Sequence, residues 1–248
     1  MTNIIVNGAL GKMGKFIINK LNKKGYDIIG GVDISKSIYN GITITDNLDE
    51  LIDKKVKPFK KDKRFIIIDF SKKNEKKTES LVKNSRTEHY QNILKYIEND
   101  INPIIGIDGV NTKEINKIIQ LSKKKNLGGV IACDFSIGTF IMNSINPKIA
   151  SLFEHTKHVK YFYSSDDENP NGKIKQVDIG KDIYLHSNIS NIKLACSFAN
   201  FENEGEMFSI SHKIITREPY VDGIICCINK IPELNQIEFG LDKIEKFH

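Results

Sequence analysis

The feature that most constrains the fold is a glycine-rich turn near the start of the chain. Gly8, Gly11 and Gly14 follow the apolar residues 3–7 at intervals of three, and apolar positions recur at helical spacing over 12–24. This pattern predicts a strand, a tight turn and a helix in succession. Glycine lets the backbone turn sharply and approach a ligand closely, and a helix N-terminus attracts anions. The turn therefore predicts a site for a phosphate-containing ligand.

An acidic residue at the end of the next predicted strand strengthens this interpretation. Asp33 closes the apolar run 27–33, at the position where an acid binds a ribose hydroxyl in dinucleotide-binding folds. The glycine spacing is GxxGxxG and not the commoner GxGxxG, so a glycine turn in another α/β fold is the alternative. The order strand, turn, helix, strand and acid favours a dinucleotide.

The remaining periodicity predicts an α/β protein with a change of character near its middle. In the first half, a loop is predicted over 53–64, strands over 65–69, 103–106 and 129–133, and helices over 88–99 and 112–125. In the second half, the expected elements are a helix over 138–154, strands over 158–163, 176–179, 192–201 and 206–213, and a helix over 219–231. We therefore expect a Rossmann-like parallel-sheet domain and an α+β domain with an open, mixed or antiparallel sheet.

Composition narrows the classes of partner. The 248 residues carry a net charge of +6, but lysine clusters such as 123–125 lie in polar stretches without interleaved aromatic residues. This favours a solvated surface and no nucleic-acid partner. No apolar run reaches the roughly 18 residues that span a membrane. The four cysteines show no CxxC spacing. They predict no metal site and a soluble protein of a reducing compartment, the cytoplasm or an organelle stroma if a transit peptide was removed.

Several sequence blocks resemble the family of 4-hydroxy-tetrahydrodipicolinate reductases, also called dihydrodipicolinate reductases. The first block is VNGALGKMGKFI, which contains the glycine turn. The others follow in the order of the family, as IIIDFS (66–71), IIGIDG (104–109), ACDFSIG (132–138) and GEMFSISHKIITREPYVDG (205–223). The last block is the most specific, because its glycines, histidine, arginine and tyrosine fall in step without a gap. Together the blocks extend over nearly the whole chain.

The resemblance implies an NAD(P)H-dependent reductase of the diaminopimelate route to lysine, with a small-molecule substrate and a homotetrameric assembly. It implies a discontinuous dinucleotide-binding domain, 1–133 with 219–248, and a substrate-binding and oligomerisation domain, 134–218. The cofactor is NADPH or NADH. Asp33 favours the ribose diol of NADH, whereas Lys12 and Lys36 are able to bind the 2′-phosphate of NADPH, which is slightly favoured.

The resemblance also assigns the cofactor-binding residues. They are Gly8, Gly11, Lys12, Met13 and Gly14 at the pyrophosphate, Asp33 at the adenosine ribose, and Asp69, Phe70, Ser71, Gly106, Gly109, Asp134, Phe135, Arg217 and Tyr220 along the rest of the cofactor.

The substrate loop departs from the family pattern, which has a histidine pair, a lysine and then Asp-Ala-Pro-Ser-Gly-Thr. The matching stretch is YFYSSDDENPNGKIKQ, 161–176, where Ser165 and Asp166 occupy the histidine positions. Gly172 is retained and, with Lys173, is assigned to substrate binding. The catalytic residues are therefore unknown, with Lys173 as a candidate to replace the missing lysine.

This departure leaves three functions open. The added carboxylates Asp108, Asp166, Asp167 and Glu168 would repel a dicarboxylate substrate if they point into the site. The protein is then an active reductase of the lysine route with an unusual substrate loop, a reductase with a changed substrate, or a non-catalytic dinucleotide-binding protein. All three predict dinucleotide binding.

Overall fold

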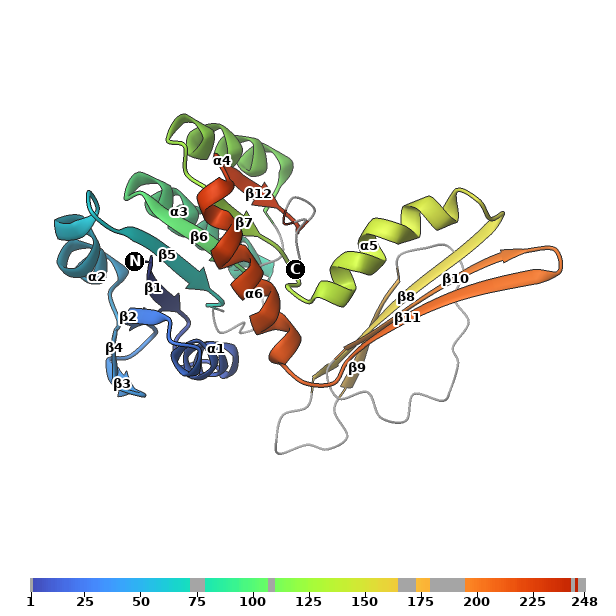
Figure 1. Ribbon diagram of the computed structural model, residues 1–248, viewed down its shortest axis with the longest axis horizontal. Helices are drawn as coiled ribbons and strands as arrows, with labels where there is room; N and C mark the ends of the chain where they lie inside the picture. The colour runs from blue at the N-terminus through green and yellow to red at the C-terminus, as the bar shows by residue number, and fades with distance from the viewer. Residues whose placement is uncertain are drawn as a thin grey trace. The chain divides into compact units, whose positions relative to one another are not determined.

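The computed structural model describes residues 2–71, 79–106, 110–164, 173–178, 195–241 and 244 (Figure 1). The chain divides into two compact units. Unit 1 comprises Met1–Asp134 and Ile224–His248, and unit 2 comprises Phe135–Gly223. The first division falls one residue after the predicted domain boundary at 133. The second falls inside a continuous helix, five residues after the predicted boundary at 218.

Unit 1 contains an eight-stranded sheet in the order β12-β7-β6-β5-β1-β2-β4-β3. The strands are β1 (Thr2–Asn7), β2 (Asp27–Val32), β3 (Ser37–Tyr39), β4 (Ile42–Thr45), β5 (Arg64–Asp69), β6 (Ile101–Ile105), β7 (Gly129–Ile131) and β12 (Ile237–Phe239). All neighbouring pairs are parallel except β3 with β4. The prediction of a Rossmann-like parallel sheet is confirmed.

Side chains of the central strands alternate between two apolar faces. Ile5 and Ile67 pack in one core cluster with Ile93 of the helix α3 (Glu79–Glu98). The intervening residues Ile4 and Ile66 are also fully buried, on the opposite face of the sheet. Burial of both faces is typical of a parallel sheet covered by its crossover helices. Those helices also include α1 (Lys12–Lys23), α4 (Thr112–Lys124) and α6 (Glu218–Lys230).

The loop predicted over 53–64 is wrong in its first half. After the short helix α2 (Leu48–Leu51), the chain forms a π-helical turn, η1 (Ile52–Val56), and a 3-10 turn, η2 (Lys57–Phe59). Ile52 and Val56 are 2% and 0% exposed and belong to the core cluster. Burial of these apolar side chains holds the segment against the sheet, although lysines separate them in the sequence.

Two short strands, β3 and β4, were not expected from the periodicity. They are joined by Asn40 and Gly41, which both have a positive φ, 50° and 79°. Asn-Gly at such a turn is the strongest local signal for a two-residue hairpin, so the sequence did contain the information.

The described residues of unit 2 form the helix α5, the first residues of α6 and an antiparallel sheet. Its elements are α5 (Ile137–Ala150), β8 (His155–Ser164), β9 (Lys173–Asp178), β10 (Ala195–Asn203) and β11 (Glu206–Ile214), and the sheet order is β11-β10-β8-β9. Every neighbouring pair is antiparallel. Met142 of α5 packs against Ala199 and Phe201 of β10. The open sheet of the predicted α+β domain is confirmed.

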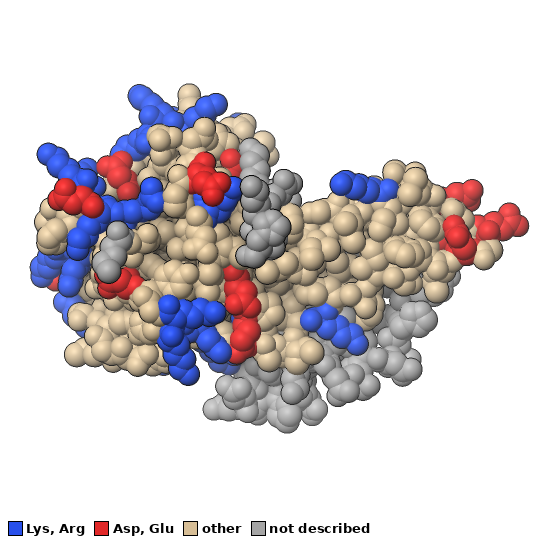
Figure 2. Space-filling model, viewed as in Figure 1, with Lys and Arg blue, Asp and Glu red and all other residues tan. Residues whose placement is uncertain are grey.

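Lysines of unit 1 pair with carboxylates over much of the surface. Figure 2 shows Lys and Arg side chains (blue) interspersed with Asp and Glu side chains (red) on the face of the molecule that is in view. Asp100 forms ion pairs with two lysines. Its Oδ1 atom lies 2.7 Å from Lys125 Nζ, and its Oδ2 atom lies 3.2 Å from Lys60 Nζ. Lys57 lies 2.6 Å from Asp53. Across the described ranges, no helix combines the length and the apolar character needed to cross a membrane.

Candidate functional site

The strand order of unit 1 places a topological switch point beside β1. The chain passes from β1 through α1 to β2 on one side, whereas β5 lies on the other side of β1. At such a topological switch point, the connections leave the carboxyl ends of adjacent strands in opposite directions. Ligands of doubly wound sheets bind in the resulting crevice. The glycine turn follows β1 directly and therefore lies at this switch point, between β1 and α1 (Figure 1).

The turn requires glycine at two of its three glycine positions. Gly8 has a φ of +76°, and a Cβ atom there would lie 2.8 Å from the backbone nitrogen of Ser71. A Cβ atom at Gly14 would overlap the carbonyl oxygen of Gly8 and lie 2.9 Å from the Cα atom of Ala9. The turn is thus packed between the start of α1 and the segment that follows β5. Any larger residue at position 8 or 14 would prevent this packing.

The start of α1 is suited to an anion. Gly11 is the N-cap residue, is exposed, and has no side chain to occupy the backbone N–H groups of the first turn. That first turn reads Lys12-Met13-Gly14-Lys15, with two cations and no carboxylate. The helix dipole and these charges both favour a phosphate at this position. The residues present therefore fit the pyrophosphate of a dinucleotide.

Asp33 is held beside the glycine turn. Its Oδ2 atom accepts a hydrogen bond of 2.7 Å from the backbone N–H of Leu10, and its Oδ1 atom accepts one of 2.7 Å from Ile34. The next side chain, Ile34, is 85% exposed. The carboxylate thus joins the end of β2 to the turn after β1, at the position that sequence reasoning assigned to the adenosine ribose.

Asp69 is buried at the end of β5 and is not exposed to a ligand. Its side chain is 1% exposed and accepts hydrogen bonds from Asn7 Nδ2 (3.1 Å), Tyr96 OH (2.8 Å), Ser71 N (2.9 Å) and Ser71 Oγ (2.6 Å). We call these four residues, Asn7, Asp69, Ser71 and Tyr96, the Asp69 cluster. Among the described residues, no ion pair to the Asp69 carboxylate is found, so neutral donors stabilise it.

Phe70 connects the end of β5 with both neighbouring strand ends. Its backbone N–H donates to the carbonyl oxygen of Asn7 at 3.1 Å. Its ring lies against Gly106, where a Cβ atom would overlap it. Gly106 in turn donates its N–H to the carbonyl oxygen of Asp69 at 3.0 Å. The predicted site residues Asp69, Phe70, Ser71 and Gly106 therefore lie together with Gly8.

Sequence reasoning missed two members of the Asp69 cluster. Asn7 is a polar residue, 6% exposed, that follows the apolar residues 4–6 at the end of β1. Tyr96 is fully buried in α3 among Ile93 and Ile97. Burial and the charge of Asp69 raise the pKa of the Tyr96 hydroxyl well above its ordinary value, so the group stays protonated and donates. The available signal was the polar residue in β1, because buried tyrosines and asparagines need partners.

The later predicted cofactor residues lie near the division between the units. Asp134 ends the first segment of unit 1, and Phe135 begins unit 2 with a side chain that is 1% exposed. Within unit 2, the carbonyl oxygen of Phe135 contacts the backbone of Gly223. Arg217 and Tyr220 are part-buried at the start of α6, where Tyr220 N–H donates to the carbonyl oxygen of Arg217 at 3.2 Å.

Comparison with known proteins shows to which family the chain belongs. Residues 2–135, more than half of the chain, match the family described as dihydrodipicolinate reductase, N-terminus. The chain belongs to the dihydrodipicolinate reductase family. It is 27% identical to the 4-hydroxy-tetrahydrodipicolinate reductase of Carboxydothermus hydrogenoformans, over 98% of this chain and 99% of that one. It is 26% identical to the same enzyme of Legionella pneumophila, with the same coverage. The resemblance drawn from the sequence blocks is confirmed.

A solved structure agrees at the level of the fold. The dipicolinate-bound dihydrodipicolinate reductase of Paenisporosarcina sp. TG-14 superposes with a TM-score of 0.69, over 98% of this chain and 99% of that one. Sequence identity between the two is 17%. The arrangement of a parallel sheet and a separate small sheet is therefore shared along the full length of the chain.

Two stretches that contain predicted site residues, 107–109 and 165–172, lie where the structure is not described. Gly109, Ser165, Asp166 and Gly172 lie outside the described residues, as do Asp108, Asp167 and Glu168. Lys173 is the first residue of β9 and pairs with Ser164 of β8. The assignments of these residues stay predictions. The match to the family's N-terminal part ends at 135, before the substrate loop begins.

Proposed function

We propose that the protein is a reductase of 4-hydroxy-tetrahydrodipicolinate that uses a reduced nicotinamide dinucleotide. The observation that carries this proposal is the glycine turn at the switch point beside β1, in a chain of this family. Gly8 and Gly14 permit the close packing of the turn, and Gly11 leaves the start of α1 without a covering side chain, which is what a pyrophosphate needs. The proposal retains a small-molecule substrate and a homotetrameric assembly from the family.

The chain's own residues divide the binding of the dinucleotide between them. The turn from Gly8 to Gly14 would hold the pyrophosphate, and Asp33 the adenosine ribose. Phe70, Ser71 and Gly106 lie at the ends of β5 and β6 and would bound the remainder of the cofactor. A reduced nicotinamide supplies hydride when it is bound. The proton donor is a separate requirement, for which Lys173 is the candidate that the sequence offers.

The test is oxidation of NADH or NADPH by the purified protein, with the substrate generated in place by the preceding synthase of the route. We expect turnover of about 1 per second or faster, the ordinary range for enzymes. Dinucleotide binding without oxidation would instead indicate a changed substrate or a non-catalytic role. Failure to bind either dinucleotide would contradict the proposal altogether.

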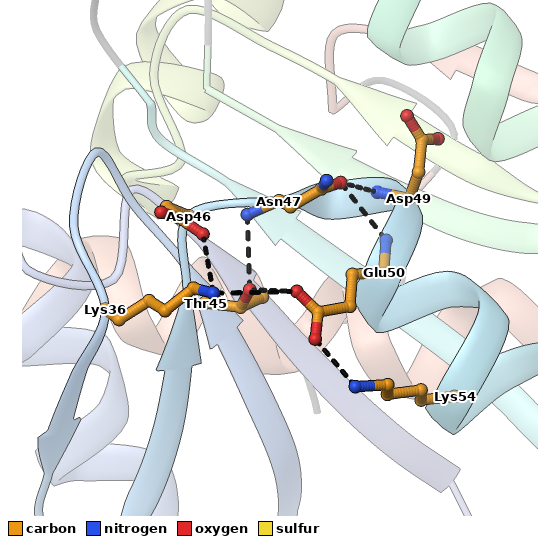
Figure 3. Close-up of polar contacts among 7 residues, drawn as sticks. All are labelled: Lys36, Thr45, Asp46, Asn47, Asp49, Glu50 and Lys54. Atoms are coloured by element: carbon orange, nitrogen blue, oxygen red, sulfur yellow. Dashed lines mark hydrogen bonds and ion pairs between the residues drawn. The ribbon is translucent and has the colours of Figure 1, made fainter.

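The preferred cofactor in this proposal is NADH, which reverses the slight preference for NADPH drawn from the sequence. The Asp33 carboxylate would face the 2′-position of the ribose, where a phosphate would be repelled. Lys36 was, with Lys12, one of the two predicted partners of that phosphate. Its Nζ atom lies 3.6 Å from Asp46 Oδ1 and 4.0 Å from Glu50 Oε2 (Figure 3). The charge of Lys36 is therefore already offset.

The elements next to Asp33 fix this arrangement of charges. Asp33 N–H donates to the carbonyl oxygen of Thr45 at 3.0 Å, and Thr45 Oγ1 donates to Glu50 Oε2 at 3.5 Å. The hydrogen bond from Lys54 to Glu50 and the charges of Lys54 and Lys36 lower the pKa of Glu50, which keeps it ionised. Among the five charged residues described here, the three carboxylates of Asp33, Asp46 and Glu50 thus outnumber the two ammonium groups of Lys36 and Lys54.

Replacing Asp33 with asparagine is expected to raise affinity for NADPH about tenfold, which corresponds to about 1.4 kcal/mol. Asparagine removes the charge but keeps an oxygen that can accept the hydrogen bond from Leu10. Affinities for NADH and NADPH are measured by fluorescence titration of wild type and variant.

Lys36→Gln is the matched control for this prediction. Because Lys36 already faces Asp46 and Glu50, we expect its removal to change affinity for NADPH by less than about threefold, as is usual for exposed ion pairs. A loss of NADPH affinity larger than that in Lys36→Gln, with no gain in Asp33→Asn, would contradict the preference for NADH.

A further inference from the structure

The Asp69 cluster is more elaborate than packing requires. Tyr96 is enclosed by the apolar side chains of the core, where phenylalanine would fill nearly the same volume. Its hydroxyl instead donates to Asp69 Oδ2 at 2.8 Å, and Asn7 Nδ2 lies 3.0 Å from the same hydroxyl oxygen. A buried carboxylate depends on hydrogen-bond donors such as these. The hydroxyl therefore has a specific role in fixing Asp69.

Asp69 in turn fixes Ser71, which lies next to the glycine turn. Its Oδ1 atom accepts both the backbone N–H and the hydroxyl of Ser71, at 2.9 Å and 2.6 Å. The Ser71 nitrogen is the atom closest to the position a Cβ of Gly8 would take, at 2.8 Å. A small shift of Ser71 would thus move directly against the turn.

Asn7 contacts the same turn directly. While Asn7 Nδ2 donates to Asp69, Asn7 Oδ1 accepts the backbone N–H of Gly8 at 3.1 Å. The backbone carbonyl of Asn7 also accepts the N–H of Phe70 at 3.1 Å. The glycine turn and the Phe70–Ser71 segment are therefore both tied to one buried carboxylate.

We propose that Tyr96 and Asn7 are positioning residues for dinucleotide binding, acting through Asp69 on the turn at Gly8 and on the Phe70–Ser71 segment. This inference rests on the proposed function, because it assumes that the turn binds a dinucleotide. Neither residue needs to touch the ligand, since Tyr96 is 0% and Asn7 6% exposed. The part of the ligand affected is the pyrophosphate, which lies at the turn.

The test compares Tyr96→Phe with wild type in binding NADH and ADP-ribose, which share the pyrophosphate. We expect both dissociation constants to rise about tenfold and by the same factor, because the loss of one donor to a charged group loosens the turn that binds the shared part. Calorimetric titration gives both constants, and the melting temperature of the ligand-free protein is recorded for each variant.

Two control variants separate positioning from stability. Tyr90→Phe removes a hydroxyl from a part-buried tyrosine of the same helix, outside the Asp69 cluster. Ile93→Val removes a methylene from the apolar core around Tyr96 and lowers the melting temperature, but it removes no hydrogen-bonding group of the cluster. We expect both to bind the two ligands as wild type does.

Equal loss of affinity in Ile93→Val and Tyr96→Phe would overturn the inference, because stability alone would then explain the result. Unchanged dissociation constants in Tyr96→Phe, with a wild type that binds, would overturn it and leave the proposed function intact. A wild type that binds neither ligand would overturn the proposed function, and this inference with it.

Discussion

Replacing Gly14 with alanine is expected to weaken dinucleotide binding by roughly a hundredfold or more. Gly14 lies in the first turn of α1, where helix propensity alone would make alanine stabilising by about 1 kcal/mol. The packing decides otherwise. The new Cβ atom would overlap the carbonyl oxygen of Gly8 and lie 2.8 Å from its carbonyl carbon. Both are backbone atoms that cannot rotate away.

The consequence for binding follows from where Gly8 would have to move. Gly8 is enclosed by Ser71 on one side and accepts the N–H of Gly11 at 3.1 Å on the other. The turn must therefore change shape, and its N–H groups would no longer converge on the pyrophosphate. We also expect the free energy of unfolding to fall by about 2 kcal/mol, as for other overpacked sites. Titration with NADH and urea denaturation measure the two effects.

Gly25→Ala provides the matched control at the other end of α1. Gly25 has a φ of +80°, but a Cβ atom there would meet nothing within 4 Å. Alanine at Gly25 is expected to cost about 1 kcal/mol of stability from its left-handed conformation, with dinucleotide affinity unchanged. If Gly14→Ala bound NADH as tightly as Gly25→Ala does, the assignment of the turn to the pyrophosphate would be wrong.

The part of the site that could be predicted from the sequence is the part with a local pattern. The glycine turn is predictable because Gly8, Gly11 and Gly14 lie between a strand and a helix of distinct periodicity. The hairpin of β3 and β4 was equally predictable from Asn40 and Gly41, although its strands are too short to show alternation. Local sequence and local structure agree at both places.

The Asp69 cluster could not be predicted in the same way, because its contacts join residues far apart in the sequence. Asp69 and Tyr96 are 27 residues apart, and Asn7 and Tyr96 are 89 apart. Nothing in the periodicity of α3 distinguishes a tyrosine that packs from one whose hydroxyl reaches a carboxylate. The register of β1 with β5, which places Asn7 opposite Asp69, supplies that information.

The strand β12 also could not be predicted from its own sequence, because its position in the sheet depends on residues far away in the chain. It is three residues long and adds to β7 at one edge of the sheet, after a helix that begins in unit 2. No run of this length has a recognisable pattern by itself. Its position depends on the return of α6 to unit 1, which the resemblance to the family implied and the periodicity did not.

The largest expected effect on stability outside the turn is that of Gly223→Ala. Gly223 lies within α6, where alanine would again be favoured by propensity. A Cβ atom there would overlap the carbonyl oxygen of Phe135 and lie 2.8 Å from its carbonyl carbon. Phe135 is 1% exposed, so its backbone has no free space to move into. We expect unit 2 to lose about 3 kcal/mol or more in its free energy of unfolding.

Asp222→Ala is the control for Gly223→Ala, because it alters the adjacent residue of the same helix on its exposed side. An exposed substitution of this kind changes stability by about 0.5 kcal/mol or less. Urea denaturation of both variants, followed by circular dichroism, therefore compares the same helix with and without a blocked contact to Phe135. Equal midpoints for the two variants would show that α6 can shift away from Phe135 at no cost. The close approach of Gly223 to Phe135 would then have no part in fixing the start of unit 2.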